Sequence, residues 1–189
     1  MESFEHLVKV FLESRYYVVT TNVKFPVRKR TKKVDREEYQ THGHEVDIVA
    51  AKSDSLILGS VKSFFGSKGV SRKAFRVSTD EADGSYLVGY DMFNKPEISK
   101  AIMEGAEQRY GYRKSQIHFC LFVGKFKSKD DEEIITKELS NLKIGDNPVK
   151  VYNVRDVSEG LLKAAESKTY IDDPVLTTLK ALRQSGYLK

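Results

Sequence analysis

Two short apolar runs separated by three polar residues constrain the fold of this chain more than any other feature. The first run covers residues 45–51, the second covers residues 55–61, and Lys52, Ser53 and Asp54 lie between them. Runs of this length, rich in valine, isoleucine and leucine and joined by a short polar spacer, are typical of an antiparallel β-hairpin. The sequence therefore predicts two adjacent strands, and with them a sheet.

A helix and a further strand are predicted before this hairpin. Apolar residues recur at three- and four-residue spacing from Phe4 onward, and Ser3 is placed as an N-cap. Residues 16–25 are rich in aromatic, β-branched and threonine residues, which favour a strand, and Pro26 is expected to end it. The chain should therefore begin with a helix that leads directly into a strand.

Further helices and strands are predicted after the hairpin. Pro96 suits the first turn of a helix that continues to Tyr110, and Gly111 would end it. Residues 117–126 form the most continuous apolar run and predict the central strand of the sheet. The later patterns predict a helix over residues 130–142, a strand over residues 149–154 and two C-terminal helices, the second begun by Asp172, Asp173 and Pro174 and ended near Gly186.

We therefore predict an α/β domain over residues 1–157 and a helical C-terminal extension, packed on it, over residues 158–189. No apolar run approaches the roughly 20 residues that a membrane-spanning helix needs, and the acidic start of the chain does not resemble a signal peptide. Cys120 is the only cysteine, which excludes an intramolecular disulfide and a cysteine zinc site. These features predict a cytoplasmic protein with no membrane partner.

Positive charge is concentrated on both sides of the hairpin. The formal net charge is +5, and seven cations lie between residues 24 and 36 beside the single anion Asp35. Such runs suit a partner that carries phosphates, although a solvated loop is the alternative explanation. Phe64 and Phe65 lie among the later cations, as in surfaces that stack bases, with core packing as the alternative. The predicted nucleic-acid contacts are Arg28, Lys29, Arg30, Lys32, Lys33, Lys68, Arg72 and Lys73.

One acid and one lysine occupy special places in the hairpin. Asp47 lies among the apolar residues of the first run, and Lys62 follows the second run about fifteen residues later. Folding of the hairpin would bring both to one edge, facing a common site. Carboxylate oxygens bind hard cations such as Mg²⁺, which activate water for phosphodiester hydrolysis, and a lysine can orient that water. An ordinary ion pair at a strand end is the alternative.

This pattern resembles the PD-(D/E)XK superfamily of restriction-endonuclease-like nucleases, in its Mrr-like and RecB-like branch. In that branch a glycine precedes an acid, an apolar residue and Asp, and an apolar strand then ends in an acid-any-lysine triplet. The matching residues here are Gly43, Glu45-Val46-Asp47 and Ser60-Val61-Lys62. The resemblance covers roughly residues 3–65 and implies a core with a helix, a mixed central sheet with a β-hairpin, and flanking helices.

The resemblance also implies a Mg²⁺- or Mn²⁺-dependent endonuclease that cuts DNA. Asp47, Lys62 and Ser60 would be catalytic, and Asp47 and the carbonyl of Val61 would bind the metal together with an acid on the first helix. Glu5 is the preferred acid, with Glu2 and Glu13 as competitors and a helix N-terminal charge as its other explanation. Ser60 departs from the family pattern, which has an acid there; it could act through a water, or catalysis could be lost.

Two other functions stay open at this point. The first is a catalytically degenerate protein of the same fold that binds DNA or assists assembly, and the second is a protein-interaction domain without nucleic acid. Cutting both strands of DNA usually takes two symmetric sites, so a homodimer is expected for an active enzyme. Gly66-Ser67-Lys68 lacks the spacing and the following hydroxyl residue of a Walker phosphate loop, so no nucleotide cofactor is predicted.

Overall fold

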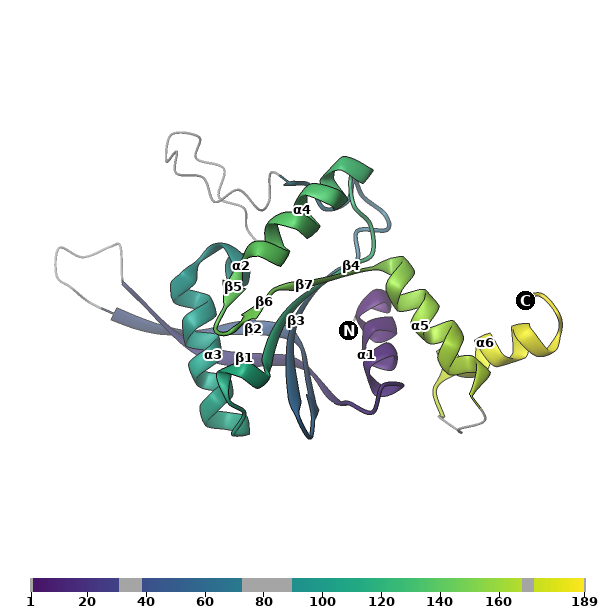
Figure 1. Ribbon diagram of the computed structural model, residues 1–189, viewed down its shortest axis with the longest axis horizontal. Coiled ribbons are helices and arrows are strands. Elements are labelled where there is room, and N and C mark those ends of the chain that lie inside the picture. The colour runs from purple at the N-terminus through teal and green to yellow at the C-terminus, as the bar shows by residue number, and fades with distance from the viewer. Residues whose placement is uncertain (1, 31–38, 73–89, 168–171, 189) are drawn as a thin grey trace.

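A mixed sheet of five strands forms the centre of the protein in the computed structural model, which describes residues 2–30, 39–72, 90–167 and 172–188 (Figure 1). The first three strands are antiparallel neighbours, and the last two run parallel to the third. The chain is therefore an α/β protein, as predicted. In spatial order the strands are β1 (Val18–Arg30), β2 (Tyr39–Lys52), β3 (Ser55–Lys62), β4 (Ile117–Val123) and β7 (Lys150–Asn153).

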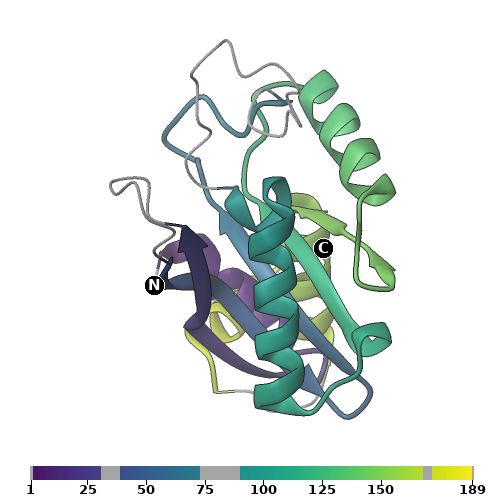
Figure 2. The same cartoon turned by 90° about the vertical axis from the view of Figure 1, so that its left-hand side faces the viewer.

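Helices cover both faces of this sheet, as Figures 1 and 2 show. Three of them, α2 (Asp91–Asn94), α3 (Pro96–Tyr110) and α4 (Lys129–Asn141), contribute buried residues to one apolar layer. On the other face α1 (Ser3–Glu13), α5 (Val154–Glu166) and α6 (Pro174–Gln184) contribute to a second layer. The remaining short elements are a 3₁₀ turn, η3 (Lys114–Gln116), and a small hairpin of β5 (Lys143–Ile144) and β6 (Asn147–Pro148).

Strand β4 shows how the two layers are built. Phe119 and Leu121 face the layer that contains α3, whereas Cys120 and Phe122 face the layer that contains α1. A strand buried on both faces needs apolar residues at every position, which explains the continuous run in the sequence. Burial raises the pKa of the Cys120 thiol to about 12, so Cys120 is a neutral core residue.

Several sequence predictions hold, and others need correction. The hairpin of β2 and β3 is antiparallel, and α3 ends as predicted at Gly111, whose φ of 75° suits glycine. Helix α1 is capped by Glu2, with Ser3 as its first residue, so Ser3 is not the N-cap. The central strand is β3 and not β4, because β1 and β2 lie on one side of β3 whereas β4 and β7 lie on the other.

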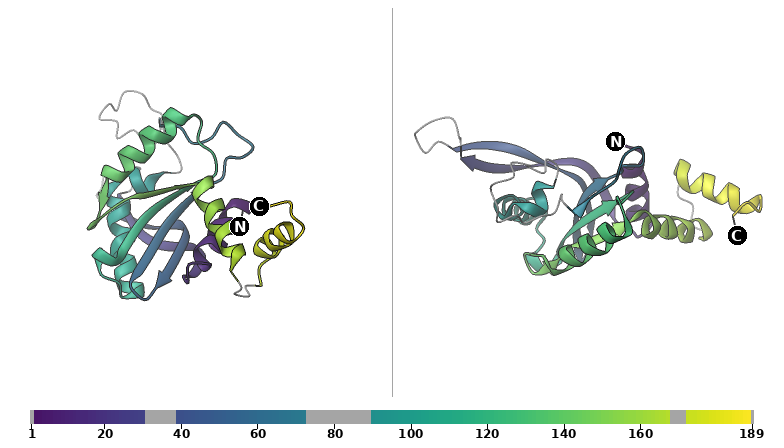
Figure 3. Two further views of the ribbon diagram at one scale, coloured as in Figure 1. Left: turned by 45° about the vertical axis from the view of Figure 1, so that its right-hand side comes forward. Right: turned by 90° about the horizontal axis from the view of Figure 1, so that it is seen from above.

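Strand β1 also differs from the prediction, because it continues through Pro26 to Arg30. Pro26 is tolerated because β1 is an edge strand, where a missing N–H donor removes no hydrogen bond to a further strand. Beyond the end of β3, β1 and β2 continue as a two-stranded arm that extends from the sheet (Figure 3). The basic residues predicted in a loop therefore begin on this arm.

The C-terminal part of the chain is joined closely to the sheet. Helix α5 starts directly after β7, so the predicted boundary between residues 157 and 158 falls inside it. Val157 and Leu161 are both buried against the second layer, and α6 packs against α5. A polar contact of 3.2 Å between His6 Nε2 and Asp173 Oδ2 links α1 to the start of α6. Within the described residues, every helix is too short or too polar to cross a membrane.

Candidate functional site

Asp47 lies where β2 separates from β3. The pairing of these strands runs from Lys52 and Ser55 to Ile48 and Gly59 and stops one residue short of Asp47. Beyond this point the N–H of Val61 in β3 donates to the side chain of Asp47 and not to the backbone of β2. The result is a carboxylate held at the open end of the hairpin.

Three consecutive residues of β3 direct donors at one oxygen of this carboxylate. The backbone N–H of Val61 donates to Asp47 Oδ2 at 2.6 Å, and Ser60 Oγ donates to it at 3.1 Å. Lys62 Nζ lies 3.9 Å from the same atom. Oδ1 accepts no hydrogen bond from the part of the chain that the structure describes. Asp47 and Lys62, which the sequence placed in one site, do lie together, and Ser60 and Val61 lie with them.

Strand β1 is irregular opposite Asp47. Asn22 occupies the facing position in the register but is not paired, and its φ of 55° is left-handed. The strand pair also reverses its faces here: Val19 packs on the α1 side of the sheet, whereas Val23 packs on the α3 side. Alternate residues of a regular strand face the same way, so both strands must turn over at Asn22 and Asp47. Asparagine adopts this conformation more readily than most residues.

Asn22→Gly should therefore leave the free energy of unfolding within about 1 kcal/mol of the wild-type value, because glycine adopts a positive φ without strain. Asn22→Val should lower it by roughly 1–3 kcal/mol, because a β-branched residue is strained in the left-handed region. Urea denaturation measures both values. Thr21→Val places the same side chain at a regular position and serves as the control. Equal stability of Asn22→Val and wild type would contradict this account.

The N-terminus of α1 lies at the end of β3. Glu2 accepts a hydrogen bond of 2.8 Å from the hydroxyl of Ser63, which follows Lys62 in the chain. Glu5 is 8% exposed; its Oε2 accepts from Glu2 N–H at 3.3 Å, and its Oε1 is buried without a partner among the described residues. Glu13 is at the far end of the helix, 3.7 Å from Lys9. Of the three acids considered for a metal, Glu2 and Glu5 are thus near the end of β3.

A hard cation fits part of this arrangement. A buried carboxylate oxygen without a donor is costly, and a cation would satisfy it. Among the residues described, no group of three or more histidine, cysteine, aspartate or glutamate side chains is placed to hold a metal. A site made of Asp47, Glu5 and the carbonyl of Val61 would contain only two such side chains. Its chemistry is that of an oxygen-lined site for Mg²⁺ or Mn²⁺.

Tyr90 is a neighbour of Lys62 that the sequence did not suggest. Its ring centre is 5.6 Å from Lys62 Nζ, within range of a cation–π interaction. Burial raises the pKa of Tyr90 to about 12, so the phenol is neutral near pH 7. Residues 78–90 show no helical or strand periodicity, and therefore no local pattern could have revealed this contact.

The predicted nucleic-acid contacts that the structure describes lie on two segments, the arm of β1 and β2 and the segment after β3, and Figure 1 draws the arm at the opposite side of the sheet from α5. Arg28 lies on the arm, where its guanidinium is 4.5 Å from the ring centre of Tyr39. Arg72 lies beside α4, where its backbone N–H donates to Asp131 Oδ1 at 2.7 Å and lowers the pKa of that buried carboxyl. Lys29 and Arg30 end β1, Lys68 is exposed in the segment after β3, and Lys32, Lys33 and Lys73 are outside the described residues.

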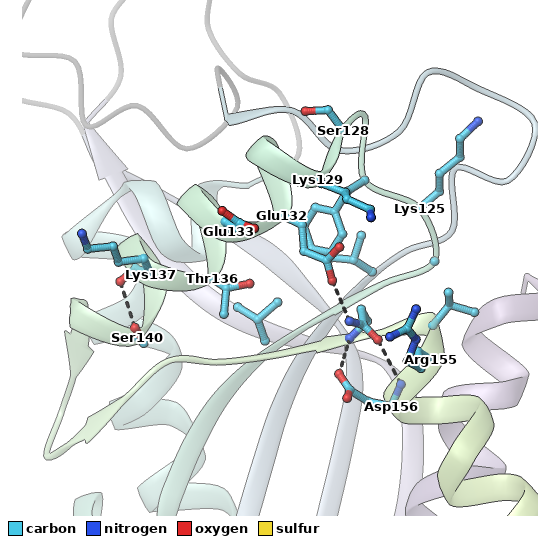
Figure 4. Close-up of a pocket in the computed structure, with 16 residues that line it drawn as sticks. Lys125, Ser128, Lys129, Glu132, Glu133, Thr136, Lys137, Ser140, Arg155 and Asp156 are labelled. Carbon is cyan, nitrogen blue, oxygen red and sulfur yellow. Dashed lines mark hydrogen bonds between the residues drawn. The ribbon is translucent and has the colours of Figure 1, made fainter.

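A groove of about 980 Å³ lies between α4, the end of β7 and the start of α5 (Figure 4). It begins at Gly124, whose N–H donates to the carbonyl of Lys62 at 2.8 Å. The sequence did not suggest this groove. It lies at the carboxyl ends of β4 and β7, where α/β proteins often bind ligands. The charged residues that line it are of both signs: Lys125, Lys129, Lys137, Arg155, Glu132, Glu133 and Asp156.

Comparison with known proteins leaves the family open. No protein-family model and no curated protein sequence matches the chain. Among solved structures, the crystal structure of a protein of unknown function, AF1548, is similar at 16% sequence identity and a TM-score of 0.42. The match covers 97% of this chain and 77% of that one. A likeness this distant indicates neither an activity nor a family.

Proposed function

We propose that this protein is a metal-dependent nuclease with a restriction-endonuclease-like core, and that it hydrolyses DNA phosphodiester bonds at Asp47 and Lys62. The observation that carries the proposal is the convergence of Ser60, Val61 and Lys62 on one oxygen of Asp47. The convergence leaves the other carboxylate oxygen without a hydrogen bond from the described residues. A carboxylate fixed in this way is prepared to bind a cation.

The order of the elements supports the fold part of the proposal. Helix α1 precedes three antiparallel strands, α3 follows them, and β4 then joins the sheet parallel to β3. This order supports the proposed core, in which a helix and flanking helices accompany a mixed sheet that contains a hairpin. The acid and the lysine lie on the two strands of the hairpin, as the resemblance requires.

Asp47, the Val61 carbonyl and Glu5 Oε1 are the groups that would hold Mg²⁺ or Mn²⁺. The ion, when bound, would polarise the phosphate and activate a water molecule. Lys62 would orient that water and offset the negative charge that develops on the phosphate. Contact with the neutral ring of Tyr90 stabilises the Lys62 ammonium without neutralising it.

Ser60 has a structural role in this proposal that differs from that of the family acid. Its hydroxyl donates to Asp47 Oδ2 and so helps to set the orientation of the carboxylate. Ser60 is buried, and a neutral side chain avoids placing a second negative charge beside Asp47. The site would then depend on Glu5 for the additional charge that the metal needs.

Cleavage of supercoiled plasmid and of single-stranded DNA by the wild-type protein tests the proposal. Cutting in Mg²⁺ or Mn²⁺ that chelator abolishes is expected. Salt-sensitive DNA binding is expected as well, because the contacts are cationic, and a dimer is expected if both strands of a duplex are cut. A protein that binds DNA but leaves it intact under all these conditions would contradict the catalytic part of the proposal.

A second function is favoured by two observations. Position 60 is a serine, and within the described residues no group of three or more histidine, cysteine, aspartate or glutamate side chains is placed to hold a metal. This function is DNA binding without cleavage, in a fold that has lost its chemistry. The same assay separates the two, since a binding protein shows salt-dependent affinity and no product. Absence of both affinity and product would favour a protein-interaction domain.

A further inference from the structure

The turn that follows β3 exposes two aromatic rings beside the proposed active site. Phe64 is 37% exposed and Phe65 is 52% exposed. In the sequence, Ser63 separates these two residues from Lys62. Phe64 also has a φ of 48°, in the left-handed region where a bulky side chain is strained. Neither ring gains full burial in return for this strain. Strained and exposed side chains of this kind occur preferentially at functional sites.

The turn is held in place by the segment that follows β4. Besides the bond from Gly124 to Lys62, the N–H of Val70 donates to the carbonyl of Lys125 at 2.9 Å, and Lys125 Nζ donates to the carbonyl of Ser67 at 2.9 Å. A side chain at Gly124 would collide with the carbonyl of Ser63 and approach the Phe65 ring. The two segments are thus in close contact, which holds the backbone of the turn in place.

Phe65 is fixed by a further contact. Its ring packs edge-on against Phe4 of α1, with ring centres 5.4 Å apart and planes at 84°. One side of the Phe65 ring is therefore supported by the protein, and about half of the side chain is left to solvent. A rigid ring with an accessible surface loses little conformational entropy when a flat molecule stacks on it.

Three cations lie on the turn or on the segment bonded to it. Lys62 precedes the two rings, Lys68 is exposed four residues after Phe64, and Lys125 is bonded to Ser67 within the turn. Aromatic rings that alternate with cations form the surface that binds single-stranded nucleic acids, because every base has a face for stacking and every linkage has a charge. In a duplex these faces are covered by neighbouring bases.

We propose that Phe64 and Phe65 form a base-stacking step, and that the substrate is single-stranded DNA at the point of cleavage. This inference deepens the proposed function and rests on it for the position of the cut. The binding itself needs no metal and no cleavage. Stacking on Phe64 and Phe65 would favour DNA whose bases are unpaired. The cationic arm would bind the phosphates of single-stranded and double-stranded DNA alike.

Fluorescence anisotropy, measured in the presence of a metal chelator so that no DNA is cut, gives the binding affinities that test this proposal. The probes are a labelled single-stranded oligonucleotide, an abasic oligomer with the same number of phosphates, and the corresponding duplex. The wild-type protein is expected to bind the oligonucleotide about tenfold more tightly than either of the others. Phe64→Gly should remove most of this difference, and Phe65→Leu should reduce it while keeping an apolar contact with Phe4.

Phe64→Gly also separates a loss of function from a loss of folding. Glycine adopts a φ of 48° without strain, which offsets the lost partial burial of the ring, so the melting temperature should stay close to that of the wild type. Tyr187→Ala removes another exposed ring at the C-terminus and should leave every affinity unchanged. Equal affinity of the wild type for normal and abasic strands, undetectable affinity for both, or unchanged binding by Phe64→Gly would each overturn the inference. Preferential binding without cleavage would support the step while contradicting the proposed nuclease.

Discussion

Asp47→Asn is expected to lower metal-dependent DNA cleavage by at least about a hundredfold, because the amide cannot bind a divalent cation as the carboxylate does. The folded structure should persist. The amide oxygen can still accept from Val61 N–H and from Ser60 Oγ, so the free energy of unfolding should change by about 1 kcal/mol or less. Steady-state cleavage of a labelled substrate measures the first effect and urea denaturation the second.

Asp47→Ala should lower the free energy of unfolding more than Asp47→Asn does. This change leaves the N–H of Val61 without its acceptor and should cost roughly 1–3 kcal/mol of unfolding free energy. Both variants should be inactive, but only the alanine variant should be clearly less stable. Wild-type cleavage by Asp47→Asn would show that the carboxylate binds no catalytic metal.

Lys62→Ala is expected to reduce cleavage by a similar factor, at least about a hundredfold, with nearly unchanged affinity for DNA. The reason is that Lys62 contacts Asp47 and would act on the attacking water, whereas the cations of the arm would supply most of the binding. Lys100→Ala is the matched control, since it removes the same charge from the exposed surface of α3. An equal loss of cleavage in both variants would attribute the effect to net charge.

Phe122→Ala is expected to have the largest effect on stability, a loss of roughly 3–5 kcal/mol in the free energy of unfolding. Phe122 is fully buried in β4 and stacks on Tyr152, with ring centres 5.1 Å apart. Its ring also lies against Gly59 of β3, where an added Cβ would be only 2.9 Å away. Removal of the ring would therefore leave a cavity between the sheet and the helices of the second layer.

Phe122→Leu retains most of the side chain and should cost less, about 1–2 kcal/mol. Urea denaturation of both variants gives the comparison, and the two values should differ by more than the experimental error. A loss below about 1 kcal/mol for Phe122→Ala would mean that the layer under α1 and α5 is loosely packed.

Local patterns were sufficient to predict most of the elements. Helix α3 was expected from the proline at its start and the glycine after its end, because both residues act through their own backbone conformations. The hairpin was also expected from a local pattern, namely two apolar runs joined by a short polar spacer. Strand β1 was placed too short, because the tolerance of Pro26 depends on its position at the edge of the sheet.

The candidate site was predicted in part. Asp47 and Lys62 could be placed together because the two strands of a hairpin have a defined register. The contacts of Tyr90 and Gly124 with Lys62 could not be predicted, since both residues are distant from Lys62 in the sequence. Nor did any pattern indicate the left-handed conformation of Asn22 opposite the carboxylate.

The sequence by itself determined the α/β class, the hairpin and the identity of its acid and lysine, because periodicity and turn residues act over a few neighbouring positions. Only the tertiary structure decided that three donors of β3 share one oxygen of Asp47, that Glu5 Oε1 is buried without a partner among the described residues, and that Phe64 is strained and exposed. These features depend on where β2 leaves β3 and on which segments pack beside that point. Such contacts are set by the burial of the whole chain, and residues distant in sequence contribute to them.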